Sequence, residues 1–160
     1  MVDLAARLYH AVDNDDCQEI QNLIELGVDL NQFYDDFSHS HSKSILHYAC
    51  AKGRKDCVKI LLDKGALVNV KDKWRMTPIM YCVSTGNDDI INMLTQKDPE
   101  AINSQDTNGR SALHFSVEYG SETTVKLLLE KGADVNIQDN DGYTPLMTLL
   151  AKKENKHYLT

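Results

Sequence analysis

The chain has 160 residues, 42% hydrophobic and 26% charged, a composition typical of globular proteins that argues against wholesale disorder. The formal net charge of -7 at pH 7 argues against a surface for nucleic acid or anionic membranes, because both need concentrated basic residues. Apolar runs are shorter than the roughly 20 residues that span a bilayer, and residues 1–16 do not resemble a signal peptide. We therefore expect neither membrane insertion nor nucleic-acid binding.

A four-residue phrase recurs along the chain at a nearly constant interval. It reads SILH, TPIM, SALH and TPLM from residues 44, 77, 111 and 144, so that successive starts lie 33, 34 and 33 residues apart. A fainter copy precedes these four, with Leu8, Ala11, Gly27 and Asn31 in matching positions. A period of this length indicates a repeat architecture.

Each unit predicts two short helices followed by a loop. The Ser or Thr that opens the phrase predicts an N-cap, which two copies follow with a first-turn proline. Glycine nine residues after the cap, as at Gly53 and Gly86, ends this helix. A second helix with its apolar residues on one side ends at Gly65 or Gly132. The following Val-Asn-x-x-Asp-x-x-Gly stretch is expected to form a hairpin-like link to the next cap.

These phrases resemble the ankyrin repeat, above all LLLEKGADVNIQDNDGYTPLM and GRSALHFSVEYGSETTVKLLLEKGADVN. The resemblance runs from about Leu4 to the C-terminus. It implies one all-α solenoid domain, in which stacked helix pairs linked by β-hairpin loops stabilise one another. The predicted units are an N-terminal cap at about 2–33, whole units at 39–71, 72–105 and 106–138, and a partial unit at 139–160.

Several units depart from the pattern. Asp15 stands where a helix-ending glycine is usual and Glu19 replaces an inward apolar residue, as suits an N-terminal cap. The first hairpin, QFYDDFSHSHSK, is longer than the others, and Lys-Asp-Pro at 97–99 predicts a changed turn. The last unit stops just inside the point where its second helix should begin, so we expect the natural chain to continue.

The Ser-His pairs of the phrase raise the possibility of catalysis. Ser44 with His47, and Ser111 with His114, place a hydroxyl and an imidazole three residues apart, as a nucleophile and its base require. A catalytic pair is needed once, whereas this pair recurs in register and methionine replaces the histidine in two copies. We therefore predict a structural hydrogen bond from the imidazole to the cap hydroxyl and loop backbone, and no enzyme.

The cysteines and loop histidines offer no metal or cofactor site by their spacing. The four cysteines contain no C-x-x-C pair, which predicts a reducing compartment, the cytoplasm or the nucleus. Those at 50, 57 and 82 fall where the repeat places small or aliphatic core residues. His39 and His41, near Asp35 and Asp36, form a metal-like cluster that lacks further spaced ligands, and a solvated loop is expected there.

Partner-binding residues are expected where stacking leaves positions free. In the matched ankyrin pattern these are the hairpin tips and the exposed turns of each first helix, which line the concave side. The set includes the only tryptophan and other residue types that dominate interfaces. Its members are Lys43, Lys73, Trp74, Arg75, Met76, Asn108, Arg110, Glu118, Tyr119, Asp141 and Tyr143. A secondary candidate is the long first hairpin, with Phe33, Tyr34, Phe37, His39 and His41.

Two alternatives are expected for the conformation of each of two residues on the hairpin tip that carries Trp74 and Arg75. Trp74 either stands exposed for a partner or folds back on Lys43 or a neighbouring hairpin. Arg75 stands where Gly109 and Gly142 provide a residue that tolerates positive φ, so either its backbone is strained or its turn has changed.

The sequence predicts a binding module for another protein or peptide segment, with a monomer slightly favoured. One alternative is a regulatory or targeting part of a longer effector, such as a ubiquitin-ligase adaptor, a kinase, a channel or a germline scaffold. The phrases KSILHYAC and MTPIMYC resemble phrases of germ-cell ankyrin scaffolds. Another alternative is a nucleotide-sensing ankyrin domain that uses the basic residues Lys43, Lys52, Lys73, Arg75 and Arg110.

Overall fold

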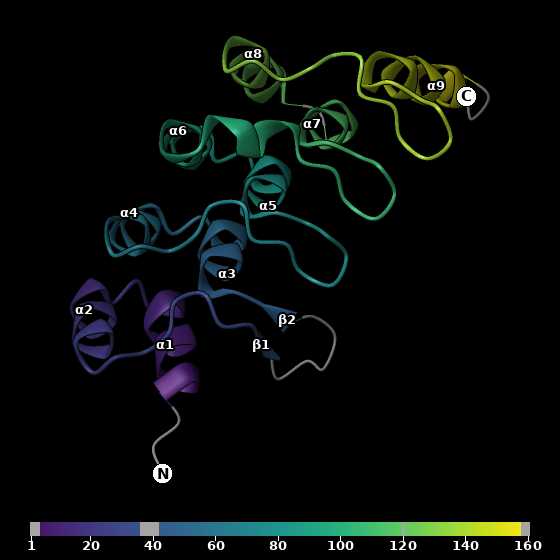
Figure 1. Ribbon diagram of the computed structural model, residues 1–160. Helices are drawn as coiled ribbons and strands as arrows, with labels where there is room; N and C mark the ends of the chain where they lie inside the picture. The colour runs from purple at the N-terminus through teal and green to yellow at the C-terminus, as the bar shows by residue number, and fades with distance from the viewer. Residues whose placement is uncertain (1–3, 36–41, 120, 158–160) are drawn as a thin grey trace.

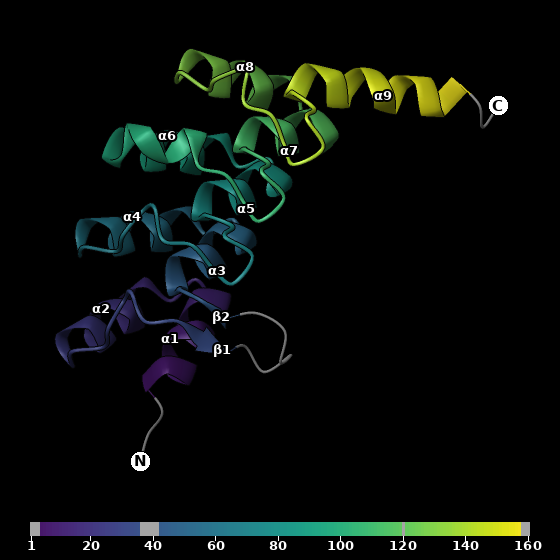
Figure 2. The ribbon, with the colours of Figure 1, turned by 45° about the vertical axis from the view of Figure 1, so that its right-hand side comes forward.

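The computed structural model describes residues 4–35, 42–119 and 121–157, which form a stack of helix pairs (Figure 1). The inner helices are α1 (Leu4–Asp13), α3 (Ile45–Lys52), α5 (Pro78–Thr85), α7 (Ala112–Tyr119) and α9 (Pro145–His157). The outer helices are α2 (Cys17–Glu25), α4 (Lys55–Asp63), α6 (Asp88–Lys97) and α8 (Glu122–Glu130). The links between units project to one side, and the described ends of the chain lie at opposite ends of the stack (Figure 2). The predicted all-α solenoid is confirmed.

One continuous apolar core runs between the two layers of helices. Ile45 and Ala49 of α3, Leu61 of α4 and Ile79 of α5 are all fully buried. Cysteines at 50, 57 and 82 are also buried in this core, as their register predicts. Because each short helix pair buries its faces only against its neighbours, the stack stabilises units that would not fold alone.

The Ser-His pairs have the predicted structural role. The Nδ1 atom of buried His47 accepts hydrogen bonds from the Ser44 backbone N–H at 3.3 Å and from its hydroxyl at 2.8 Å. Since Nδ1 accepts, Nε2 carries the proton and donates to the Met76 carbonyl at 3.0 Å. His114 repeats the arrangement with Ser111 and with the Tyr143 carbonyl. Each imidazole thus joins the start of one inner helix to the hairpin of the next unit.

Thr77 is the N-cap residue of α5, as predicted, but its side chain makes no capping hydrogen bond. Met80 stands at the histidine position, and the buried Thr77 hydroxyl has no hydrogen-bond partner. An unpaired buried hydroxyl costs about 1–3 kcal/mol. Pro78 at the first turn, together with packing, therefore starts this helix without help from the threonine side chain.

The links are hairpins in which regular strands are short. β1 (Tyr34–Asp35) pairs antiparallel with β2 (Ser42–Lys43), with Tyr34 opposite Lys43. The later links are tight turns, the first closed by the Asp72 N–H to Met76 carbonyl bond at 3.0 Å. Among the described residues, the expected β-hairpin therefore contains regular strands only in the long first link.

The departures at the start and middle of the chain have local explanations. Asp15 adopts the left-handed conformation of the glycine it replaces, with φ 56°. Glu19 is held by an ion pair with Arg7 at 2.5 Å between its Oε1 and the guanidinium. At the changed turn, Asp98 caps a short 3-10 helix, η1 (Pro99–Asn103), and accepts from the Glu100 N–H at 3.1 Å.

The predicted end of the last inner helix is wrong. The second helix of this unit was expected to begin just before the chain stops, yet α9 continues without a break to His157 and has 13 residues. Its sequence has Lys153 where other units have glycine, and no left-handed residue ends the helix there. Leu146, Met147 and Leu150 are 62, 49 and 52% exposed, whereas their counterparts at 79, 80 and 83 are buried.

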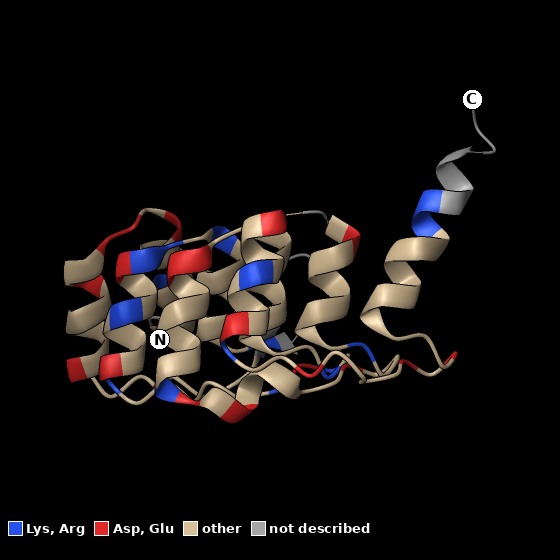
Figure 3. Cartoon of the chain, turned by 90° about the horizontal axis from the view of Figure 1, so that it is seen from above, with Lys and Arg blue, Asp and Glu red and all other residues tan. Residues whose placement is uncertain are grey.

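Charged residues of both signs are interspersed over the helices and loops (Figure 3). In the described parts of the chain, no helix has both the length and the apolar character needed to cross a bilayer. The four cysteines, all within those parts, are free thiols.

We expect His47→Met, which copies the residue of the third unit, to lower the free energy of unfolding by about 1–2 kcal/mol near pH 7.5. Burial lowers the pKa of His47. The unfolded chain therefore takes up a proton below about pH 6.5 that the folded chain resists. The advantage of the wild type should shrink as the pH falls toward about 5.5, as measured by urea denaturation of both proteins.

Met80→His is the reciprocal control. It places an imidazole beside the unpaired Thr77 hydroxyl and should raise the free energy of unfolding by about 1 kcal/mol. Two results together would contradict the neutral, hydrogen-bonded imidazole. The wild type would exceed His47→Met in free energy of unfolding by the same amount at every pH, and Met80→His would be no more stable than the wild type.

Candidate functional site: the hairpin tips and inner helices

A buried or partly buried aspartate fixes the backbone of each later hairpin tip. In the third unit, Oδ1 of Asp72 accepts from the backbone N–H groups of Trp74 and Met76, both at 2.9 Å. Its Oδ2 accepts from the Tyr81 hydroxyl at 2.7 Å, which ties the tip to the inner helix. The pattern recurs from Asp106 to Asn108 and Arg110, and from Asp139 to Asp141 and Tyr143. The side chains at the tips are therefore presented by a fixed backbone.

Neighbouring tips are also bonded to each other. The Thr107 N–H donates to the Trp74 carbonyl, and the Asn140 N–H donates to the Asn108 carbonyl, both at 2.9 Å. At Gly109 this contact is so close that a Cβ would lie 2.9 Å from the Asn140 backbone nitrogen. The tips of the last three units therefore form one continuous surface.

Trp74 lies on the first of these bonded tips with half of its surface exposed. The Lys73 ammonium is 5.4 Å from the centre of the indole ring, so the two side chains form a cation–π pair on the tip. Arg75 is exposed and has φ 58°, so of the two alternatives for this turn the structure has the left-handed backbone and not a changed turn. Met76 differs from its neighbours because it is partly buried and packs against the core.

The next tip is occupied by a network around Arg110. Its guanidinium forms an ion pair with Glu118 and lies 4.3 Å from the centre of the Phe115 ring. The Phe115 and Tyr119 rings are parallel within 4°, with centroids 6.4 Å apart, and Tyr119 is 60% exposed. Arg110, Glu118 and Tyr119, predicted separately, are therefore brought together through a phenylalanine.

The last tip presents Tyr143, 47% exposed, and Asp141, which is also exposed. Both backbone N–H groups are held by Asp139, while the Tyr143 carbonyl accepts from His114. Asn108, on the preceding tip, is exposed as well.

Part of the secondary candidate can be placed. Phe33 is 40% exposed, and its ring lies 6.2 Å from the His47 ring at a tilted angle. The Lys43 ammonium lies 4.7 Å from the Tyr81 ring centre. The predicted residues Phe37, His39 and His41 lie outside the described residues, as does the side chain of Tyr34.

An aromatic series on the inner helices escaped the sequence-based prediction. Tyr48, Tyr81 and Phe115 each lie four residues after a cap, 33 and 34 residues apart, and that spacing is a visible signal. Each ring has a cation near its face, supplied in order by Lys52, Lys43 and Arg110. Tyr48 and Tyr81 are partly buried and Phe115 is buried, so the series lines the inner helices and adds little exposed surface.

Four of the five basic residues considered for nucleotide binding are engaged within the chain. Lys52 pairs with Asp13 at 3.1 Å, and Arg110 pairs with Glu118. Lys43 and Lys73 lie over aromatic rings. Since an anion would have to compete with these contacts, the arrangement favours a protein partner over a phosphate.

Comparison with known proteins agrees with this geometry. A family model described as ankyrin repeats (3 copies) matches residues 8–106 and 98–158. The chain is 33% identical over 157 residues to the probable E3 ubiquitin-protein ligase XBOS33 of Oryza sativa subsp. japonica, covering 89% of this chain and 30% of that protein. It is 33% identical over 109 residues to the putative ankyrin repeat protein FPV223 of Fowlpox virus, covering 68% of this chain and 75% of that one. Human inversin is 31% identical over 135 residues, which cover 84% of this chain and 12% of inversin.

Arg75→Gly should raise the free energy of unfolding by about 1 kcal/mol, because glycine adopts φ 58° without the steric cost that arginine bears. A Cβ at Gly142 would meet open space, so Gly142→Arg should lower the free energy of unfolding by about 1–2 kcal/mol through its left-handed backbone alone. Gly109→Arg should lose more, because its Cβ would also meet Asn140. Equal losses in the two glycine variants, measured by thermal unfolding, would contradict the close contact between tips.

Proposed function

The chain belongs to the ankyrin repeat family, whose repeats are protein-interaction modules, and we propose that it binds a partner protein or peptide segment across its hairpin tips and inner helices. The observation that carries the proposal is the exposure of three large aromatic side chains, two on the bonded tips and Tyr119 at the end of α7. Trp74, Tyr119 and Tyr143 are 50, 60 and 47% exposed. Tryptophan and tyrosine are enriched among the residues that supply most of the affinity at interfaces.

Trp74 is the proposed centre of the surface. It offers a flat apolar ring at low conformational cost, because the adjoining backbone is already held by Asp72. Lys73 and Arg75 flank it and add cationic groups that suit backbone carbonyls or carboxylates of the partner. Met76, being partly buried, would support the ring from below more than contact the partner.

The charge of the whole chain favours a partner that carries basic groups. The net charge is -7, and Asp141 is exposed near the far end of the proposed surface. Glu118 is already paired with Arg110, so it would contribute less unless the partner displaces that arginine. Attraction of this kind chiefly raises the association rate and falls with salt.

We propose the cytoplasm or nucleus as the compartment, in keeping with four free thiols, and a monomeric module without catalytic residues of its own. Ankyrin repeats are typically binding modules, although the relatives include proteins named as a kinase and a probable ubiquitin ligase.

A second candidate is a regulatory or targeting role within a longer effector. The observation that favours it is the apolar face of Leu146, Met147 and Leu150 on α9, at positions that the next unit covers elsewhere in the stack. Further helices of the same kind would fit this face. The chain spans 30% of the rice ligase and 12% of inversin.

Trp74→Ala should weaken the binding of a captured partner by about 2 kcal/mol or more, roughly 30-fold in affinity. It should change the free energy of unfolding by about 0.5 kcal/mol or less. Partners would be captured on the immobilised wild-type chain, identified by mass spectrometry, and their affinities measured for each variant by calorimetry.

Two variants make this experiment decisive. Leu67→Ala removes an apolar side chain that is 58% exposed but lies after an outer helix, and it should bind as the wild type does. Leu146→Gln changes the exposed face of α9. Affinity that depends on Leu146 and not on Trp74 would overturn the tip surface and support the second candidate.

A further inference from the structure

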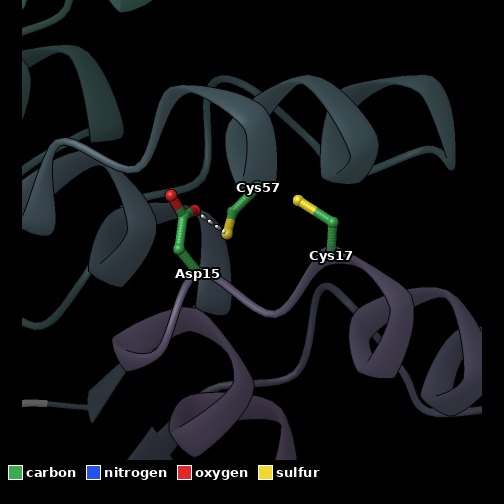
Figure 4. Close-up of side chains that lie close together, drawn as sticks. All are labelled: Asp15, Cys17 and Cys57. Atoms are coloured by element: carbon green, nitrogen blue, oxygen red, sulfur yellow. Dashed lines mark hydrogen bonds between the residues drawn. The ribbon is translucent and has the colours of Figure 1, made fainter.

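Two cysteines and an aspartate from separate units meet at the contact between the first two outer helices. Asp15 lies in the turn between α1 and α2, Cys17 is the first residue of α2, and Cys57 comes from α4 (Figure 4). Their ligand atoms, one carboxylate oxygen and two sulfurs, all lie within 4.8 Å of one another. The Cys57 thiol donates a hydrogen bond to Asp15 Oδ1 at 3.0 Å. Two sulfur ligands and one oxygen are a donor set typical of thiophilic divalent cations.

The same register carries a polar pair at one other place in the stack, so it is a point of contact between units. The first residue of an outer helix meets the third residue of the next at Asp88 and Thr124, where the hydroxyl donates to the carboxylate at 2.6 Å. Cys17 and Cys57 occupy the corresponding positions of α2 and α4. A cation here would join the first unit to the second.

The backbone at Asp15 is held in an unfavourable conformation. It is one of two non-glycine residues with positive φ among the described parts of the chain, and its counterparts in the next units are Gly53 and Gly86. A left-handed conformation costs an ordinary L-residue about 1–2 kcal/mol, and aspartate somewhat less. Glycine would remove that cost but would also remove the carboxylate that reaches Cys57.

The surroundings are negative and partly open. Burial, followed by the charges of Asp15 and Asp56, raises the pKa of the Cys17 thiol, and burial with the Asp15 hydrogen bond raises that of Cys57. A divalent cation compensates the negative charge, and the exposed Asp15 and half-buried Cys17 give it a path in.

We propose that Asp15, Cys17 and Cys57 bind a thiophilic divalent cation such as Zn²⁺, which fastens the N-terminal unit to the stack. In tetrahedral geometry the sulfurs would lie about 3.8 Å apart, a distance that small side-chain rotations supply. Binding forms two metal–thiolate bonds and one carboxylate bond and releases two thiol protons to solvent, with solvent at the fourth position. Sequence spacing gave no hint of this site, because its ligands come from different units.

The test uses the whole reduced chain carrying Cys50→Ala and Cys82→Ala, so that only the two proposed thiols remain. Titration with Co²⁺ should give a sulfur-to-cobalt charge-transfer band and tetrahedral visible bands at one equivalent, which Zn²⁺ then abolishes. Because two protons leave, the apparent affinity should fall by up to about 100-fold per unit decrease in pH. Zn²⁺ should also raise the melting temperature.

Two variants separate ligation from folding. Cys57→Thr copies Thr124 at the same register, and Asp15→Gly copies Gly53; both should fold. Cys57→Thr should abolish the charge-transfer band, and Asp15→Gly should weaken Zn²⁺ binding by about tenfold or more and lose most of the Zn²⁺-dependent rise in melting temperature. Absence of the band in the parent chain, its persistence in Cys57→Thr, unchanged Zn²⁺ affinity in Asp15→Gly, or a Cys17–Cys57 disulfide in place of metal binding would overturn the proposal.

Discussion

One carboxylate oxygen in each later unit holds the hairpin tip, and the proposed binding surface depends on it. The Oδ1 atom of Asp72 accepts two backbone N–H groups across the turn, and Asp106 and Asp139 do the same. Since backbone groups make these bonds, the turn leaves the side chains between them free to differ. That freedom explains why the turn at residues 72–76 carries Trp74 and Arg75 where the turn at residues 139–143 carries Asp141 and Gly142.

The tips are also coupled to the stack. His47 and His114 donate to carbonyls at the ends of the following hairpins, and the Tyr81 hydroxyl reaches Asp72 from an inner helix. Movement of a tip therefore requires breaking bonds to two units, so the aromatic rings are presented with little freedom to lose on binding. A repeat architecture in which each unit contacts its neighbours thus gains a precisely placed surface from a small set of side-chain hydrogen bonds.

Much of this arrangement could be predicted from the sequence, because it depends on local rules that the repeat shows several times. The helix pairs and the Ser-His role follow from comparing one unit with another, whereas at Arg75 that comparison left a strained backbone and a changed turn as alternatives. Thr77 begins its helix as predicted but without a side-chain bond, and the end of α9 was mispredicted, because each residue was assumed to act as its counterparts do. The Thr77 hydroxyl lacks the histidine that would bind it, and Lys153 lacks the left-handed preference that ends a helix.

Features made by packing between units were harder to foresee. The spacing of Tyr48, Tyr81 and Phe115 is visible in the sequence, but the cations over these rings come from different positions of the repeat. The meeting of Cys17 with Cys57 depends on how one outer helix lies on the next.

Amide hydrogen exchange at Trp74 and Met76 in the wild type, Asp72→Asn and Asp72→Ala shows whether the Asp72 carboxylate holds the tip. The asparagine amide oxygen can still accept both N–H groups, whereas alanine cannot. We expect near-wild-type protection in Asp72→Asn and roughly tenfold or faster exchange at both amides in Asp72→Ala, with the amides of Asn108 and Arg110 unaffected. Unchanged protection at Trp74 and Met76 in Asp72→Ala would contradict this role of Asp72.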